Sequence, residues 1–255
     1  MQNRGAFMTK IINVKDKLGN PAEEAYRVLR TNIQFCNFDS KIKTLAITSC
    51  NPGEGKTTTA INLSISMAMS GMKILLIDAD LRKPALVKRL GGTNAVGLTN
   101  LISGQASLQD AINYTDVDGF CYITCGPTPP NPAELLSSER FDEIINEAKK
   151  HFDMVIIDTP PLGSVIDCAI ISSRTDGTLI VIKSKAVDYR SAMRVKEQLE
   201  KVNARIIGVV LNKLDRKEYR YYYSPYEYYG NGSAENTGKG WFRKHRKQKA
   251  QKQEA

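Results

Sequence analysis

The sequence predicts an α/β fold in which a doubly wound, mostly parallel sheet is flanked by helices. Five short, nearly continuous apolar segments run along the chain, and such segments are typical of strands covered on both faces. Helical segments separate them, and strands that alternate with helices form parallel sheets. A glycine-rich loop joins the first strand to the helix after it. At 255 residues, the chain is long enough to bury one substantial core.

The predicted elements follow one another in a regular order. Residues 21–35 carry apolar side chains at Ala25, Val28, Leu29 and Ile33, a spacing that predicts an amphipathic helix. The apolar segments predict strands at 44–49, 73–80, 153–161, 178–183 and 206–212. Further helices are predicted over 60–71, 107–114, 138–151, 164–173 and 188–202.

The alternation of strands and helices divides the chain into three parts. Residues 1–20 form an N-terminal segment, 21–215 one domain, and 216–255 a tail. The tail has no apolar period, so we expect it to be disordered. It holds ten Lys and Arg against four Asp and Glu, a net charge of +6, and it holds seven of the eleven tyrosines. Such a basic tail indicates an anionic partner, namely lipid, nucleic acid or an acidic protein. Alternatively, the tail has no partner and is solvated, which aids solubility.

Composition excludes several classes of protein. Hydrophobic residues make up 42% and charged residues 25% of the chain, as in globular proteins. The apolar runs are far shorter than the ~18 residues of a membrane span. The first residues lack a signal-peptide pattern, so we expect a cytoplasmic protein. The five cysteines are scattered and form no CxxC pair, which argues against disulfides and a zinc site.

The segment "CNPGEGKTTT" at 50–59 predicts a P-loop that binds the phosphates of a nucleotide. Gly53 and Gly55 let the backbone curl so that its N–H groups point at phosphate oxygens, and the following helix adds its positive end. Lys56 would bridge the outer phosphates, and the Thr57 hydroxyl would bind Mg²⁺. The strict motif has glycine where this chain has Cys50. The predicted nucleotide contacts are Gly53, Glu54, Gly55, Lys56, Thr57 and Thr58.

Aspartates end two of the predicted strands. Asp78 and Asp80 follow "ILLI", and Asp158 follows "MVII". Parallel strands bring their carboxyl ends to one edge of the sheet, so all three should lie beside the P-loop. Three carboxylates near a triphosphate imply Mg²⁺ between them. For one isolated aspartate a helix N-cap is the better interpretation, and this alternative applies to Asp78 and to Asp80, but three strand-end aspartates together with a P-loop favour the metal site.

The last predicted strand leads into "NKLD" at 212–215. This segment matches the Asn-Lys-x-Asp motif that recognises the base in GTPases. We expect Asn212 to contact the nucleotide base, although a turn can produce so short a match by chance.

Together these motifs resemble the bacterial tyrosine kinases of capsule and exopolysaccharide synthesis, which are P-loop enzymes unrelated to the eukaryotic kinase fold. "CNPGEGKTT" is similar to their Walker A motif, "VIIDTPP" to their Walker B motif, and "ILLIDADLRKP" to their second Asp box with a following arginine, here Arg82. "GPTPPNPAELLSS" is also typical of the family. "EAYRVLR" carries Glu24, Arg27 and Arg30, as in the helix through which members assemble into rings. The resemblance covers about 20–215.

The resemblance implies transfer of the γ-phosphoryl group of ATP to tyrosine. It assigns catalysis to Lys56, Asp78, Asp80 and Asp158, with Asp78 as acceptor of the phenol proton. Thr57, Asp80 and Asp158 would bind Mg²⁺. The substrate would be the tyrosine cluster of a neighbouring subunit, made up of Tyr219, Tyr221, Tyr222, Tyr223, Tyr226, Tyr228 and Tyr229.

The resemblance also implies partners. These are further copies of the chain in a ring, a transmembrane activator subunit of the polysaccharide co-polymerase type that recruits the kinase to the inner face of the membrane, and a cognate tyrosine phosphatase. Each tail phosphate adds about −1.5 to −2 of charge. We therefore expect phosphorylation to disperse the ring and to regulate polysaccharide synthesis and export.

Two other functions stay open. The chain resembles partition and positioning ATPases, but these carry a signature lysine where this chain has Asn51. Alternatively, the basic tail binds nucleic acid or membrane and the P-loop regulates that binding. Nucleic acid is the less favoured of these partners.

Overall fold

The computed structural model describes residues 20–36 and 42–215. The predicted disordered tail, 216–255, and residues 1–19 of the predicted N-terminal segment lie outside this part. One compact unit ends at Lys213, and a second unit begins at Leu214, of which only two residues are described. The domain boundaries therefore stay a prediction.

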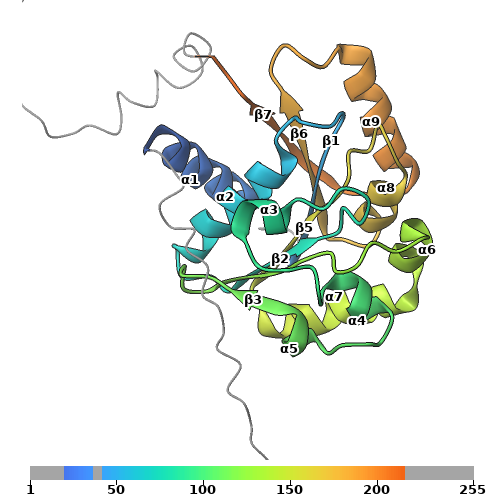
Figure 1. Cartoon of the computed structure of the whole chain (residues 1–255). Coiled ribbons are helices and arrows are strands. Elements are labelled where there is room, and N and C mark those ends of the chain that lie inside the picture. Colours follow the sequence, from blue (N-terminus) through green and yellow to red (C-terminus); the bar gives the residue numbers. More distant parts are fainter. Residues whose placement is uncertain (1–19, 37–41, 216–255) are drawn as a thin grey trace, which may run out of the picture. The chain divides into compact units, whose positions relative to one another are not determined.

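A seven-stranded sheet in the order β3-β4-β2-β5-β1-β6-β7 forms the centre of the described fold (Figure 1). All neighbouring strands are parallel except β3 and β4. This confirms the predicted doubly wound, mostly parallel sheet. The strands are β1 (Thr44–Ser49), β2 (Ile74–Asp78), β3 (Ile112–Tyr114), β4 (Phe120–Ile123), β5 (Met154–Asp158), β6 (Gly177–Lys183) and β7 (Ile206–Asn212).

Helices cover both faces of this sheet (Figure 1). The predicted helices at the N-terminus, after the P-loop and in the second half of the chain are confirmed to within a few residues. Three short helices of five or six residues (α3, α4 and α6) were not predicted. The helices are α1 (Asn20–Phe35), α2 (Lys56–Ala68), α3 (Leu86–Leu90), α4 (Leu98–Ile102), α5 (Leu108–Ala111), α6 (Pro132–Ser137), α7 (Glu139–His151), α8 (Asp167–Ser172) and α9 (Tyr189–Lys201).

The helix predicted over 107–114 is wrong in its second half. Ser107 caps the start of α5, because its hydroxyl oxygen accepts the Asp110 N–H and its own N–H donates to the Asp110 carboxylate. The chain then turns at Ile112 into β3, which pairs with β4. Neither short strand was predicted; in β3, pairing with β4 at the sheet edge overrides the weak local preference for helix.

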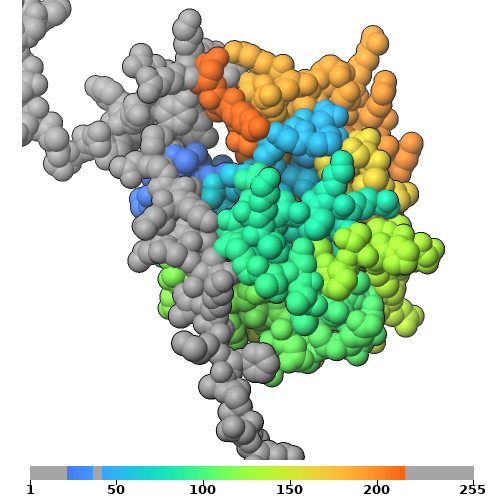
Figure 2. Space-filling model, viewed as in Figure 1, coloured from blue at the N-terminus to red at the C-terminus, as the bar shows by residue number. Residues whose placement is uncertain are grey.

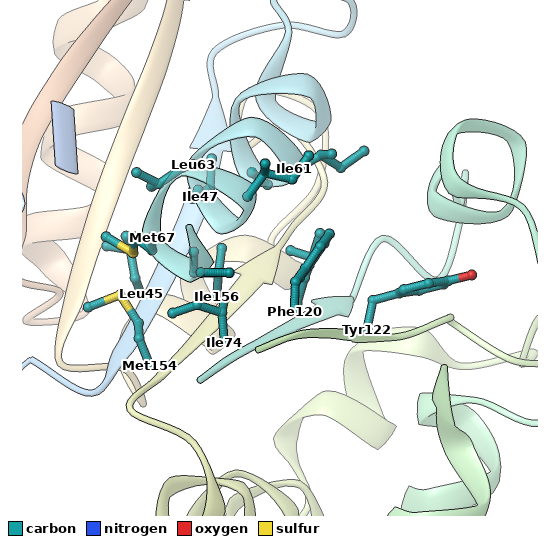
Figure 3. Packing of buried hydrophobic residues seen from close by; sticks show 14 of the residues in the cluster. Leu45, Ile47, Ile61, Leu63, Met67, Ile74, Phe120, Tyr122, Met154 and Ile156 are labelled. Carbon is teal, nitrogen blue, oxygen red and sulfur yellow. The ribbon is translucent and has the colours of Figure 1, made fainter. Parts of the chain in front are cut away.

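Alternate residues of the central strands face two separate cores. Leu45 and Ile47 of β1 pack with α1 and α2 on one face (Figure 3). Ala46 of the same strand packs with α4, α7 and α8 on the other. All residues of β1, β2 and β5 are buried, and each large aliphatic side chain stabilises the fold by about 1.5–3 kcal/mol. The carboxyl ends of these three strands are thereby fixed at one edge of the sheet.

Within the described ranges, no helix combines the length and the apolar character needed to cross a bilayer.

Candidate active site

The predicted P-loop is a tight turn between β1 and α2. Gly53 and Gly55 have φ of 78° and 103°, a left-handed backbone that favours glycine. Lys56 begins α2, so the loop leads directly into the N-terminus of a 13-residue helix. Glu54 is buried, and its carboxylate accepts bonds from the N–H groups of Cys50 (2.8 Å) and Asn51 (3.1 Å). The Glu54 side chain thus braces the loop from inside, while its backbone stays part of the predicted cradle. The residues predicted to contact nucleotide, Gly53, Glu54, Gly55, Lys56, Thr57 and Thr58, all lie in this loop or in the first turn of α2.

The Lys56 ammonium lies between two of the predicted aspartates. Its Nζ is 3.2 Å from Asp80 Oδ2 and 3.7 Å from Asp158 Oδ1. Burial lowers the pKa of Lys56, but the attraction of Asp158 and Asp80 outweighs it and leaves that pKa raised. Asp78 and Asp158 are register partners on the adjacent strands β2 and β5. The structure therefore places the three carboxylates and the lysine at one edge of the sheet.

Asp158 has the environment of a metal-supporting carboxylate. It is fully buried, and its Oδ2 accepts a 2.6 Å bond from the Thr57 hydroxyl. Its Oδ1 has no hydrogen-bond partner among the described residues. Burial raises the pKa of Asp158, and the Lys56 charge opposes this rise. A buried carboxylate oxygen that accepts no hydrogen bond, with only the Lys56 ammonium 3.7 Å away, lies next to a threonine hydroxyl, and this pair fits Mg²⁺ and its water ligands.

The carboxylates alone do not make a metal cage. Across residues 20–36 and 42–215, no three His, Cys, Asp or Glu side chains are grouped so that they would hold an ion. Mg²⁺ typically keeps several waters and binds one or two carboxylates together with substrate phosphates. The predicted ligands Thr57, Asp80 and Asp158 therefore fit an ion that arrives with the nucleotide.

Asp78 binds N–H groups at the start of a helix, which agrees with the N-cap alternative given above for this residue. Its Oδ2 accepts bonds of 3.0 Å from the N–H groups of Ala85 and Leu86, at the start of α3. Its Oδ1 accepts a weaker bond from the Asp80 N–H. The side chain is only 1% exposed, and burial, with repulsion from Asp158, raises its pKa from 3.8 to about 7. Asp78 thus caps a helix at the same edge where it would act as a base.

We expect Asp78→Asn to change how stability depends on pH. The folded-state pKa lies above the unfolded one, so the folded protein holds an extra proton between these values. The Asp78 contribution is therefore fully present below pH 4 and is lost as pH rises toward 7, by about 1.4 kcal/mol per pH unit. The free energy of unfolding is measured by urea unfolding in metal-free buffer between pH 4.5 and 6.5. In Asp78→Asn, it should decrease with pH less steeply than in the parent, by about 1.4 kcal/mol per pH unit. Asp118→Asn, at an exposed aspartate, is the matched control; equal slopes in parent and Asp78→Asn would contradict the assignment.

Asn212 contacts the P-loop in the described structure. Its side-chain N–H donates to the Glu54 carbonyl (2.9 Å), and the next residue, Lys213, donates from Nζ to the Gly53 carbonyl (2.8 Å). The sequence predicted a base contact for Asn212, which stays a prediction. The Lys213 contact was missed, since a lysine after a strand reads as a surface residue.

A second missed feature joins the two Asp-bearing loops. Arg82 donates from Nε and Nη2 to the two carboxylate oxygens of Asp167, at 2.7 and 3.1 Å. Asp167 is fully buried at the start of α8. This bidentate pair ties the segment after β2 to the segment after β5. Nothing in the sequence marks Asp167 as the partner, because an aspartate at a helix start is common.

The residues predicted for assembly lie on α1, away from this edge. Arg27 forms ion pairs with Glu23 (2.8 Å) and Glu24 (3.6 Å) on the exposed side of α1. Arg30 instead bonds the Ser66 carbonyl of α2 (2.6 Å) and is half-buried. The tyrosine cluster at 219–229 lies outside the described residues.

Comparison with known proteins agrees with this geometry. A family model described as an AAA domain matches residues 42–212. The tyrosine-protein kinase YwqD of Bacillus subtilis is 41% identical over 87% of this chain and 94% of its own length. The chain belongs to the bacterial tyrosine-protein kinases. Its enzyme class is therefore protein-tyrosine kinase.

Two solved structures share the fold of this kinase. The kinase domain of the Escherichia coli tyrosine kinase ETK is 33% identical, with a TM-score of 0.75 over 78% of this chain and 79% of that one. The septum site-determining protein MinD of Pyrococcus horikoshii, complexed with Mg-ADP, is 25% identical, with a TM-score of 0.58 over 68% of this chain and 71% of that one. The kinase domain is thus the better match in both measures.

Proposed function

We propose that this chain transfers the γ-phosphoryl group of ATP to tyrosines 219–229 of a second copy. The observation that carries the proposal is the position of the Lys56 ammonium, between Asp80 and Asp158 at the mouth of the P-loop. This lysine exchanges its carboxylate partners for phosphate oxygens when nucleotide binds. Phosphoryl transfer consists mainly of positioning and charge neutralisation, which this arrangement supplies.

Lys56, Thr57 and the loop N–H groups hold the phosphates in line with the acceptor. Thr57 and Asp80, supported by Asp158, would hold Mg²⁺, and the ion would supply the remaining positive charge. Asp78 accepts the phenol proton, because its raised pKa of about 7 suits a general base near neutral pH. The same carboxylate keeps α3 in place through the Ala85 and Leu86 N–H groups, so base and nucleotide pocket stay in register.

Assembly brings the substrate to the site. Glu24 and Arg27 lie on the exposed side of α1 and form the contact with the next subunit, and Arg30 fixes α1 on α2. An extended chain spans at most about 3.5 Å per residue, so the first dozen tail residues reach about 40 Å. Phosphorylation then reverses the tail charge and loosens the ring.

The kinase acts with other proteins in polysaccharide synthesis and export. A transmembrane activator of the co-polymerase type recruits it to the inner face of the membrane, and a cognate tyrosine phosphatase resets it. These partners are proposed because motifs typical of the kinases of capsule and exopolysaccharide synthesis are spread along the described chain, from Glu24 to Pro161.

Mixing two inactive halves of the reaction tests transfer between subunits. One full-length chain carries Lys56→Met and keeps its tyrosines; the other keeps Lys56 and has all seven cluster tyrosines changed to phenylalanine. With ATP and Mg²⁺, we expect phosphotyrosine on residues 219–229 of the first chain only, mapped by mass spectrometry. Tyr114 and Tyr189, which are 48% and 76% exposed in the folded part, serve as internal controls and should stay unmodified.

The main alternative is a nucleotide-driven positioning switch without kinase activity. It is favoured by the similarity to MinD, a septum site-determining protein. ATP hydrolysis without phosphotyrosine in the mixture, under conditions where the parent chain oligomerises, would favour the switch over the kinase.

A further inference from the structure

Two carbonyl groups of the P-loop accept hydrogen bonds from side chains at the end of β7. A loop whose N–H groups turn inward must turn its carbonyl groups outward, where they need partners. The Lys213 ammonium bonds the Gly53 carbonyl at 2.8 Å, and the Asn212 side chain bonds the Glu54 carbonyl at 2.9 Å. Figure 2 shows the orange end of β7 next to the light-blue segment that follows β1.

Lys213 adopts a backbone conformation that only its contacts explain. Its φ is 58°, one of three positive values among the described non-glycine residues. Such strain persists where the surroundings enforce it and is concentrated at functional sites. The Asn212 Oδ1 accepts the Lys213 N–H at 2.8 Å, which fixes the turn. This turn carries the Lys213 side chain back to the loop.

The two contacts also act on the donors that face the phosphates. A carbonyl and the N–H of the next residue belong to one peptide unit, and a bond at the carbonyl polarises that N–H. The Gly53 carbonyl shares its unit with the Glu54 N–H, and the Glu54 carbonyl with the Gly55 N–H. The Lys213 ammonium thus strengthens the Glu54 N–H as a donor, and the neutral Asn212 amide does the same, more weakly, for the Gly55 N–H; both are donors of the predicted phosphate cradle.

We propose that Lys213, with Asn212, is a positioning residue that holds the P-loop in its phosphate-binding shape and polarises its N–H groups. This inference rests on the proposed function only in requiring a nucleotide at the P-loop. It differs from the base contact predicted for Asn212, since it acts on the phosphate end of the ligand.

Replacing Lys213 by glycine separates this role from a merely structural one. Glycine adopts a φ of 58° without strain, so the melting temperature of the nucleotide-free, full-length protein should not fall. The Kd for MgADP, measured by calorimetry, should rise about tenfold, which corresponds to about 1.4 kcal/mol. Lys213→Arg should recover most of the affinity, because the guanidinium also donates to a carbonyl. In the kinase assay, the glycine variant should raise the KM for ATP more than it lowers kcat.

Two controls locate the effect. Asn203→Gly relieves another positive φ (56°) at a turn outside the site and should leave the Kd unchanged. Inorganic tripolyphosphate, used as a competitor of MgADP, has no base or ribose and should lose the same factor in Lys213→Gly.

Three outcomes would overturn the inference: a Kd within twofold of the parent, a lower melting temperature in Lys213→Gly, or a loss for MgADP but not for tripolyphosphate. Failure of the proposed function looks different. If the parent binds no nucleotide, both proposals fall. If Lys213 controls MgADP affinity but no phosphotyrosine forms, only the kinase proposal falls.

Discussion

Replacing Lys56 by methionine should reduce tyrosine phosphorylation by at least about 10³-fold, since removal of one preorganised donor at a developing charge has effects of this order. The Lys56 Nζ is the group between Asp80 and Asp158, and no neutral side chain can replace its charge at the phosphates. The measurement is the initial rate of phosphotyrosine formation with ATP and Mg²⁺.

The same substitution should weaken the nucleotide-free fold. Asp158 is fully buried and Asp80 is 7% exposed at its side chain, so both would lose their cation in a poorly hydrated site. Breaking such a buried pair typically lowers the free energy of unfolding by about 3 kcal/mol. Urea unfolding of the nucleotide-free protein should show this loss in Lys56→Met relative to the parent.

Lys56→Arg distinguishes the catalytic role from the structural one. Arginine keeps the positive charge and should restore most of the stability. Its planar, bulky head does not reproduce the position of an ammonium, so the phosphorylation rate should stay low. A folded Lys56→Met protein that retains more than a tenth of the parent rate would refute the assignment of Lys56.

The parts of the fold that were predictable are those decided by burial on both faces. The strand at 44–49 was predicted to the residue, because "TLAITS" is apolar or small throughout and is fully buried. β3 and β4 were not predicted, since these strands of three and four residues are defined by their pairing, β3 with β4 and β4 also with β2. The end of β2 and the segment after it were predicted to present Asp78 and Asp80, but the helix α3, which begins at Leu86, was not predicted.

The candidate site shows the same division. Parallel strands bring their carboxyl ends to one edge of the sheet, so the presence of Asp78 and Asp158 beside the P-loop could be expected from the sequence. Contacts between segments far apart in the chain could not be expected. Arg82 finds Asp167 and Lys213 finds Gly53 only after the fold has placed their loops together. The sequence does not indicate which residues pair in this way, because a single arginine, aspartate or lysine is typical of an exposed surface.

Gly55→Ala should weaken MgADP binding by about 10²-fold, equivalent to about 2.7 kcal/mol. The φ of 103° disfavours any side chain, and strain of this kind amounts to about 1–2 kcal/mol. In addition, the new Cβ would collide with Nδ2 of Asn212 and push that amide off the Glu54 carbonyl. The loop would then lose both its curvature and the hydrogen bond from Asn212, and only the bond from Lys213 would remain.

Two comparisons separate strain from collision in this variant. Gly71→Ala has a similar φ of 91° and open space around its Cβ, so it should lower stability slightly and leave the Kd for MgADP unchanged. Combining Gly55→Ala with Asn212→Ala removes the colliding amide and should bind MgADP more tightly than Gly55→Ala alone, a coupling that a double-mutant cycle measures. If the double variant binds no better than the single one, strain alone limits the loop, and the packing of Asn212 against Gly55 does not contribute to nucleotide affinity.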